Sequence, residues 1–386
     1  MGGTGRVAWA IGVAWAMWAG AAQPDAEEAP GVDLSRTLVV DAVRLVGGKE
    51  VAGRSDLSVT HGAFTYHFAD ESSVAAFEAD PERYEIQFNG ACARMGPLSS
   101  GGDARRWWVH DGRIYVFASE SCRQTFIEHA DRLLERDDRA ILPAECEAAD
   151  ARALLDRAVE WMGGPALVQD VRTVVARRAV AYEDANTRMD HHLMLALEFV
   201  PTGEVSRALR QDDWHQYGAW GEVLAGASSW SVARDGAEGP VTWTPLVASQ
   251  RRSLERQIGA ELFVALRGFL AGQATTCRVS AGDIDGTPVE WVAVHQDGVT
   301  VRLAIEPGTG RIAAIAFTAR GGPSGFIGTR ELRFSRFERA GGVLWPVEAA
   351  AWFDGQREEP EDVLGVTIEV NGEIDERWFD VATDSG

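Results

Sequence analysis

HGAFTYHFADESSVAAF, at His61–Phe77, and HDGRIYVFASESCRQTF, at His110–Phe126, are two copies of one sequence motif. Their aromatic residues recur at a spacing of 49, as Tyr66 and Tyr115, Phe68 and Phe117, and Phe77 and Phe126. In each copy a turn at Gly62 or Gly112 leads into a short aromatic strand, and a helix begins at Asp70 or Ser119. Each copy is too small to bury its own apolar face, so we expect the two copies to pack against each other.

A wider block around this repeat, from Leu45 to about Leu134, resembles a YHS domain of the form common in exported bacterial proteins. The resemblance rests on five segments in this order: LVGGKEVAG, TYHFADE, FEADPERY, GACA and DGRIYVFASESC. It implies a metal site with cysteine ligands, and the cysteines that this block offers are Cys92 and Cys122. The early cysteine of the family is absent, because the chain reads VDAVRLVGG there.

The four cysteines are Cys92, Cys122, Cys146 and Cys277, and they form no CxxC pair. In an oxidising compartment an even number of cysteines favours disulfides. We predict a Cys92–Cys122 disulfide that links the two copies of the repeat, while Cys146 and Cys277 could join the interdomain linker to the second domain. Two alternatives remain for Cys92 and Cys122: free or buried thiols, or a metal or thiol-redox site helped by His61, His67 or His110.

The N-terminus has the pattern of a secretory signal peptide. Arg6 precedes an apolar run from Val7 to Ala19, and small residues then lead into an acidic segment. We predict a signal peptide at residues 1–22, cleaved near Ala21 or Ala22, and a flexible leader at residues 23–37. The alternative is an uncleaved membrane anchor. The predicted location is therefore the periplasm or the extracellular space.

Composition limits the class of protein. The chain has 37 Lys and Arg against 58 Asp and Glu, a formal net charge of −21. This charge argues against nucleic-acid binding, which needs a basic face. The hydrophobic fraction of 46% is sufficient for real cores, and about 360 residues after the signal peptide suggest two domains. We place them at residues 38–140 and 147–386.

The second part of the chain changes from a helical pattern to the period-two pattern of strands. A helix is predicted at about residues 148–162. Strands are predicted at 171–183, 191–200, 203–211, 228–235, 275–286, 288–296, 300–307, 311–319, 329–338, 343–353 and 363–370. One long helix, from about Leu246 to Ala271, interrupts them. Short turns between strands indicate an antiparallel sheet large enough to curl, with the helix against its concave face. The predicted fold class is α+β.

This second part resembles the LolA/LolB-type periplasmic carrier fold, an unclosed β-barrel (half-barrel) with helices in its mouth. The matching segments are ARALLDRAVEWMGGPALVQDVRTV, IEPGTGRIAAIAFTARG, RELRFSRFERAGGVLWPVEAAAWFDG and VTIEVNGEIDERWFD. The resemblance implies a lipidated or otherwise apolar ligand in the half-barrel, and it identifies no binding residue by itself.

The chain contains no pattern typical of a catalytic centre. GxSxG and HExxH do not occur, and GTGR at Gly308 is a turn between two strands rather than a phosphate-binding loop. His191 and His192 are adjacent on a strand, so their side chains point to opposite faces and cannot bind one metal together. We therefore predict that the protein is not an enzyme.

Tryptophan is the stronger signal in the second part. We predict that Trp220, Trp230 and Trp243 line a cavity for an apolar ligand. The alternative is that the tryptophans fill the barrel core and seal its rim. Arg207 and Arg210 could each meet an anionic head group, but three residues apart they face opposite sides of a strand. Only one can point inward, and we assign Arg207 to the ligand.

The leading prediction for function is an exported, non-enzymatic protein that binds an apolar or lipid-like ligand, lipoproteins included, and contacts a membrane transiently. The YHS-like domain would be accessory. The alternative is a metal- or thiol-redox-sensing YHS protein with the half-barrel as a scaffold. The one cofactor that the sequence suggests is a metal ion at Cys92 and Cys122.

Overall fold

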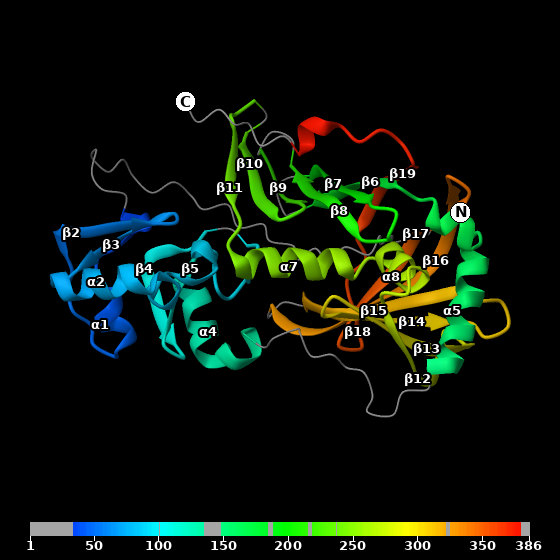
Figure 1. Ribbon diagram of the computed structural model, residues 1–386, viewed down its shortest axis with the longest axis horizontal. Coiled ribbons are helices and arrows are strands. Elements are labelled where there is room, and N and C mark those ends of the chain that lie inside the picture. Colours follow the sequence, from blue (N-terminus) through cyan, green and yellow to red (C-terminus); the bar gives the residue numbers. More distant parts are fainter. Residues whose placement is uncertain are drawn as a thin grey trace.

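A computed structural model describes residues 34–99, 101–134, 148–183, 188–214, 218–236, 238–321 and 325–379 (Figure 1). We call residues 34–134 the N-terminal unit and residues 148–379 the C-terminal unit. The predicted signal peptide, most of the predicted leader, and Cys146 lie outside the described residues. None of the described helices combines the length and apolar character needed to cross a membrane.

The N-terminal unit consists of two small sheets with helices packed around them. One sheet has the strand order β1-β3-β2 and the other pairs β4 with β5. The elements are β1 (Thr37–Leu38), α1 (Ala42–Val46), β2 (Arg54–His61), β3 (Phe64–Phe68), α2 (Glu71–Ala79), α3 (Pro81–Tyr84), β4 (Asp103–His110), β5 (Arg113–Phe117) and α4 (Glu120–Leu133).

The predicted repeat is confirmed as two hairpin–helix units, β2-β3-α2 and β4-β5-α4. Asp70 and Ser119 are the N-caps of the two helices, and each side chain accepts a hydrogen bond from the backbone N–H three residues later. The aromatic contacts are repeated as well. The ring centroids of Tyr66 and Phe77 are 4.7 Å apart at an interplanar angle of 42°, and those of Tyr115 and Phe126 are 5.1 Å apart at 41°.

The two copies pack against each other, as expected. Ile86 forms a parallel bridge with Ile114, and Cys92 forms one with Val116 of the second hairpin. Ile114 and Val116 are also part of the buried cluster that contains the aromatic residues of the first copy. Tyr115, Phe117 and Phe126 of the second copy form a further buried cluster with residues of α4, so the second copy shares one core with the first and adds one of its own.

The C-terminal unit is built from two seven-stranded antiparallel sheets. The first runs β11-β10-β9-β8-β7-β6-β19 and the second runs β12-β13-β14-β15-β16-β17-β18. Their strands are β6 (Thr173–Glu183), β7 (Arg188–Phe199), β8 (Val205–Asp213), β9 (Gly218–Ala225), β10 (Ser228–Asp235), β11 (Val241–Pro245), β12 (Thr275–Ile284), β13 (Thr287–Gln296), β14 (Val299–Ile305), β15 (Ile312–Gly321), β16 (Phe326–Ala340), β17 (Val343–Phe353), β18 (Gln356–Arg357) and β19 (Asp362–Val370). The helices are α5 (Ala148–Met162), α6 (Pro165–Gln169), α7 (Ala248–Gly259) and α8 (Leu262–Leu270).

The sheets form the walls of an antiparallel half-barrel, as the α+β prediction required. Figure 1 shows α7 and α8 between the two walls, and β19 of one sheet contacts β16 of the other. One buried cluster contains apolar residues from both sheets and from α5, α7 and α8. Burying this shared face is the main stabilising contribution to the unit.

The prediction of one long helix at residues 246–271 is wrong, because the structure has two helices, α7 and α8. The backbone of Glu261 is extended, with φ −70° and ψ 136°. Gly259 lies so close to β14 that an added Cβ would come within 2.9 Å of a Val299 methyl carbon. Both helices turn their apolar sides to the same core, so the apolar periodicity continues across the break and conceals it.

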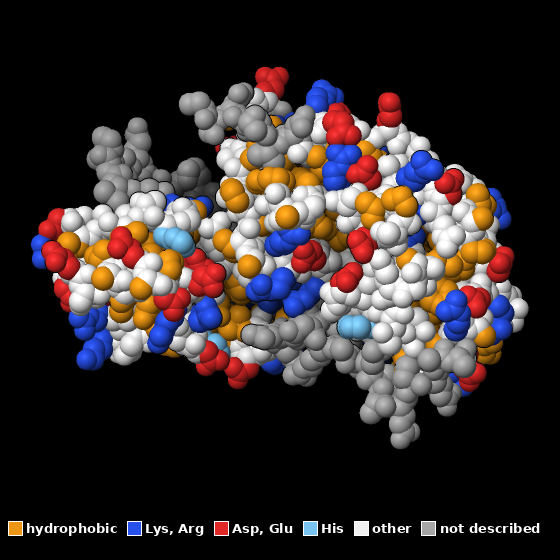
Figure 2. Space-filling model, viewed as in Figure 1, with side chains coloured by type: hydrophobic (Ala, Val, Ile, Leu, Met, Phe, Trp, Pro, Cys, Tyr) orange, Lys and Arg blue, Asp and Glu red, His pale blue; other side chains and the backbone are white. Residues whose placement is uncertain are grey.

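The two units are in direct contact. The Gln250 side chain of α7 donates to the Pro97 carbonyl oxygen over 2.9 Å, and Leu98 packs against the core of the C-terminal unit. The Arg132 guanidinium lies 3.9 Å from the ring centroid of Phe326. Figure 2 shows acidic and basic side chains interspersed over this face, with basic side chains gathered over α7.

Candidate functional site

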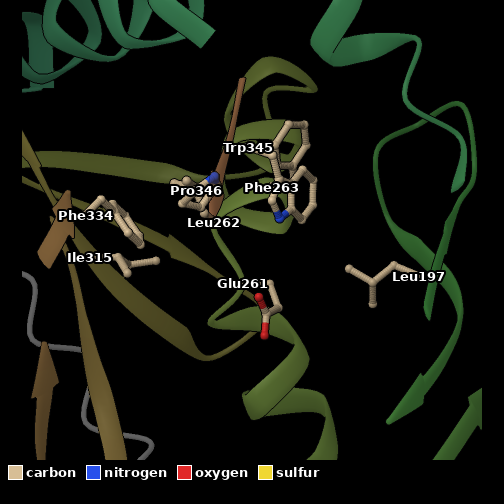
Figure 3. A pocket seen from close by; sticks show the side chains of 8 residues that line it. All are labelled: Leu197, Glu261, Leu262, Phe263, Ile315, Phe334, Trp345 and Pro346. Carbon is tan, nitrogen blue, oxygen red and sulfur yellow. The ribbon is translucent and has the colours of Figure 1, made fainter. Parts of the chain in front are cut away.

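The cavity between the two sheets is the candidate binding site (Figure 3). It is lined by one residue of β7, three at the junction of α7 and α8, and others of β15, β16 and β17, namely Leu197, Glu261, Leu262, Phe263, Ile315, Phe334, Trp345 and Pro346. Its empty volume is about 350 Å³, including space that is open to solvent. All the lining residues except Glu261 are apolar, a composition typical of sites for apolar ligands.

The cavity is closely packed in this structure. The rings of Phe263 and Trp345 stack with their centroids 4.3 Å apart and their planes at 17°. The side chains leave free space for about one water molecule. A longer apolar ligand therefore requires the first turn of α8, which carries Leu262 and Phe263, to move away from β17.

Glu261 is the one ionisable group of the cavity. It is 6% exposed and lies at the N-cap position of α8, where its side chain makes no capping hydrogen bond. Burial raises the pKa of its carboxyl well above the ordinary value, and the charge of Arg210 offsets this only in part. Figure 3 shows the carboxyl group among the apolar lining residues. A neutral carboxyl in this position can donate a hydrogen bond to a ligand.

The raised pKa of Glu261 has a consequence for stability. A carboxyl that is harder to ionise in the folded state favours folding at low pH, and this contribution is lost as the pH rises above the ordinary value of 4.5. Glu261→Gln should therefore stabilise the protein at pH 8, by on the order of 1 kcal/mol. The difference should vanish below pH 4. Thermal unfolding of both proteins from pH 4 to 8 measures it.

Glu359→Gln is the matched control, because Glu359 is exposed. It should change the melting temperature little at any pH. A Glu261→Gln variant that is less stable than the native protein at pH 8 would contradict the prediction, because the ionised carboxylate would then be contributing to the fold.

A buried polar group adjoins the cavity on the inner face of β7, β8 and β9. Arg210 pairs across the sheet with Leu195, a residue of the main core, and with Glu222. Its Nε lies 3.9 Å from Glu222 Oε2. Burial raises the pKa of the Glu222 carboxyl, and Arg210 again offsets part of this. The charge of Arg210 thus lowers the pKa of two buried carboxyl groups, that of Glu222 on the sheet and that of Glu261 at the cavity.

The same face carries a histidine–carboxylate pair. His191 Nε2 is hydrogen bonded to Asp212 Oδ1, and both residues are buried. Burial raises the pKa of the Asp212 carboxyl, and the hydrogen bond from His191 offsets only part of this increase. The Trp214 ring stacks on His191 with the centroids 4.0 Å apart, and Trp220 lies 6.2 Å beyond it. The polar side chains of this inner face, Arg210 and Glu222 together with His191 and Asp212, could contact the polar end of an amphipathic ligand.

The structure does not bring the three predicted tryptophans together. Trp220 pairs across the sheet with Asp212 and is 42% exposed. Trp230 pairs with Val223, and Trp243 pairs with Val232, so both rings lie on the opposite, outer face of the sheet. There they pack on a small cluster that includes Val223 and Phe379. No tryptophan of this set lines the cavity.

Arg207 also lies on the outer face of the sheet. It forms ion pairs with Glu198 and Glu376, and its guanidinium is 4.7 Å from the ring centroid of Phe379. Arg210, three residues later, is the arginine of this strand that faces the core. The alternation of strand side chains separates the two arginines, and the tertiary fold decides which one is inside.

The predicted disulfide between Cys92 and Cys122 is not formed in this structure. Both are buried free thiols. Within the described ranges, no group of three or more His, Cys, Asp or Glu residues is placed to hold a metal ion. Two thiols without a third ligand do not fit a four-coordinate metal site. His61 instead bonds to Glu85, and His110 lies against Phe126.

The sequence analysis missed Glu261, Glu222 and the pair of His191 with Asp212. Glu261 was hidden in the middle of the predicted long helix, and Glu222 belongs to β9, which was not predicted. One usable signal was present. Glu222 is followed by Val223 and Leu224, and Glu261 is followed by Leu262 and Phe263. A single acid within an apolar run indicates a buried carboxyl.

No family model and no curated protein matches this chain. Three solved structures resemble this chain weakly. Each alignment covers about 60% of this chain and 97% of the solved chain. A DUF1329 family protein from Desulfovibrio piger has 9% identity and a TM-score of 0.38. A putative outer membrane lipoprotein-sorting protein domain from Vibrio parahaemolyticus has 10% identity and a TM-score of 0.37. A LolA superfamily protein from Nitrosomonas europaea has 15% identity and a TM-score of 0.33. The YHS resemblance of the N-terminal unit stays a prediction.

Proposed function

We propose that this protein is an exported, non-enzymatic carrier that binds an apolar or lipid-like ligand between the two walls of its half-barrel. The observation that carries the proposal is the cavity at the α7–α8 junction, which is apolar apart from Glu261. Its lining comes from both sheets and from the break between the helices. Movement of α8 would therefore enlarge the cavity without breaking either sheet.

The polar group beside the cavity suggests an amphipathic ligand. An acyl chain would replace the contact between Phe263 and Trp345, while its polar end would reach Glu261 and Arg210. Acylated lipids and lipoproteins have this chemistry, and delivery of such a ligand would require transient contact with a membrane. The predicted signal peptide suggests the periplasm as the location, and the N-terminal unit would be accessory.

Binding of an acyl-chain fluorophore, such as a dansyl-labelled fatty acid, tests the proposal. Ile315→Trp adds bulk to the cavity wall and should lower the affinity at least about tenfold, equivalent to about 1.4 kcal/mol. Trp230→Ala, on the outer face, should leave the affinity unchanged. Circular dichroism and the melting temperature of each variant show whether the fold is kept.

The same experiment decides between two locations for the ligand. If Trp230→Ala or Trp243→Ala weakens binding and Ile315→Trp does not, the ligand binds at the tryptophans predicted from the sequence, and the cavity proposal is wrong. Failure of the native protein to bind the fluorophore, together with a ligand-free mass in native mass spectrometry, would contradict the carrier function itself.

A further inference from the structure

Cys92 and Cys122 lie side by side although they come from different elements of the N-terminal unit. Cys92 precedes the loop that leads to β4, and Cys122 lies in the first turn of α4. Both are free thiols, and both belong to one small buried cluster with Tyr115, Phe117 and Phe126. The fold has therefore brought two reduced thiols into the same small cluster.

The two thiols differ in their surroundings. Cys92 is fully buried, and its carbonyl oxygen accepts hydrogen bonds from the backbone N–H groups of Met95 and Gly96. Cys122 is 7% exposed, and its backbone N–H donates to the N-cap Ser119. The Cys92 thiol, Ser119 and the positive charge of Arg94 all favour a thiolate at Cys122, and they lower its pKa to about 5. Cys122 is thus the more accessible and the more nucleophilic of the two.

The repeat indicates that packing does not require this thiol. The residue of the first copy that corresponds to Cys122 is Ser73, which occupies the same place after the N-cap Asp70 and is also buried. Its backbone N–H makes the same capping hydrogen bond, over 2.9 Å. The fold accepts serine at this position, so a cysteine that shares a buried cluster with a second cysteine calls for a chemical explanation.

We propose that Cys92 and Cys122 are a thiol–disulfide exchange site that reacts with a disulfide of a small thiol compound or of another protein. The Cys122 thiolate attacks one sulfur of the partner disulfide, forms a mixed disulfide and releases the first partner thiol. Cys92 then loses its proton and attacks the Cys122 sulfur, which closes the Cys92–Cys122 disulfide and releases the second partner thiol. Two electrons pass from the protein to the partner. One leaving thiolate takes the proton that Cys92 loses and the other takes a proton from water, and a reduced dithiol reverses both steps.

Peptide mapping of the full-length native protein tests the proposal without any variant. The reduced protein is placed in buffers of oxidised and reduced glutathione, quenched with acid, alkylated and digested with trypsin. Cleavage at arginine separates the two cysteines into peptides 84–94 and 114–123. We expect these peptides to become linked to each other and to separate again as the proportion of reduced glutathione rises. Peptides with Cys146 or Cys277 should not join them.

Two variants identify the attacking thiol. Cys92→Ser should accumulate a mixed disulfide with glutathione at Cys122, because the second step is blocked. Cys122→Ser should lower the reaction of Cys92 with oxidised glutathione more than tenfold. Cys277→Ser, a buried thiol elsewhere, is the control and should leave the exchange unchanged.

Three results would overturn the proposal. The first is that peptides 84–94 and 114–123 stay unlinked in the folded native protein at every glutathione ratio. The second is linkage that occurs equally with Cys146 or Cys277. The third is a stoichiometric metal ion that native mass spectrometry finds on the protein and that Cys122→Ser removes, because the thiols would then be metal ligands.

Discussion

Replacement of Arg267 with alanine is expected to lower the free energy of unfolding by about 3–5 kcal/mol, because each buried carbonyl group left without its donor costs about 1–3 kcal/mol. Arg267 of α8 is 3% exposed. Its guanidinium donates to the carbonyl oxygens of Gln169 over 2.7 Å and of Val200 over 3.1 Å, and also to Val168 and Val171. Without the side chain, these buried carbonyl groups would lose a hydrogen-bond donor.

Urea denaturation monitored by circular dichroism measures this effect. Arg252→Ala, an exposed position on α7, is the matched control and should change the free energy of unfolding by less than about 0.5 kcal/mol. Arg267→Lys should recover only part of the loss, because one ammonium group cannot reach all four carbonyl oxygens. An alanine variant as stable as the native protein would contradict the proposed role of Arg267 in holding α8 to α6 and β7.

Phe77→Ala and Phe126→Ala should each lower the free energy of unfolding by about 3–5 kcal/mol, as is usual for a buried phenylalanine. Phe77 is 1% exposed and Phe126 is fully buried. Each ring contacts two aromatic rings of its own hairpin. The centroid distances to Phe68 and Phe117 are 5.2 and 5.1 Å, so the two substitutions should have similar effects.

Denaturant unfolding followed by circular dichroism measures both variants. Phe77→Leu and Phe126→Leu are the controls and should cost less, because they keep most of the apolar volume. If one alanine variant were destabilised by several kcal/mol and the other by less than about 1 kcal/mol, the two copies would not be energetically equivalent.

Much of the fold could be predicted from the sequence because the signals are local. The spacing of 49 between aromatic residues identified the two hairpin–helix units, and Asp70 and Ser119 marked the helix starts. Eleven of the strands in the C-terminal unit followed from period-two alternation. The missed strands are β9, β11 and β18. β9 contains Gly218, Ala219 and Gly221, β11 is only five residues long, and β18 has two residues.

The candidate site was much less predictable. Its lining comes from β7, β15, β16, β17 and the α7–α8 junction, so residues between 197 and 346 in sequence meet in one place. Periodicity placed Trp230 and Arg207 on strands but could not say which face of the sheet the helices would cover. For the same reason, spacing alone could not distinguish Arg207 from Arg210.

By itself, the sequence determined the α+β class, the internal repeat, the antiparallel connectivity and the adjacency of the two copies. These features follow from patterns within a few turns or one hairpin, where backbone geometry relates neighbouring residues directly. The tertiary structure alone decided the break at Glu261, the pairing of Arg210 with Glu222 on the inner face, and the free-thiol state of Cys92 and Cys122. Each depends on which distant elements pack together, and burial then sets both the charge state of a carboxyl and the reactivity of a thiol.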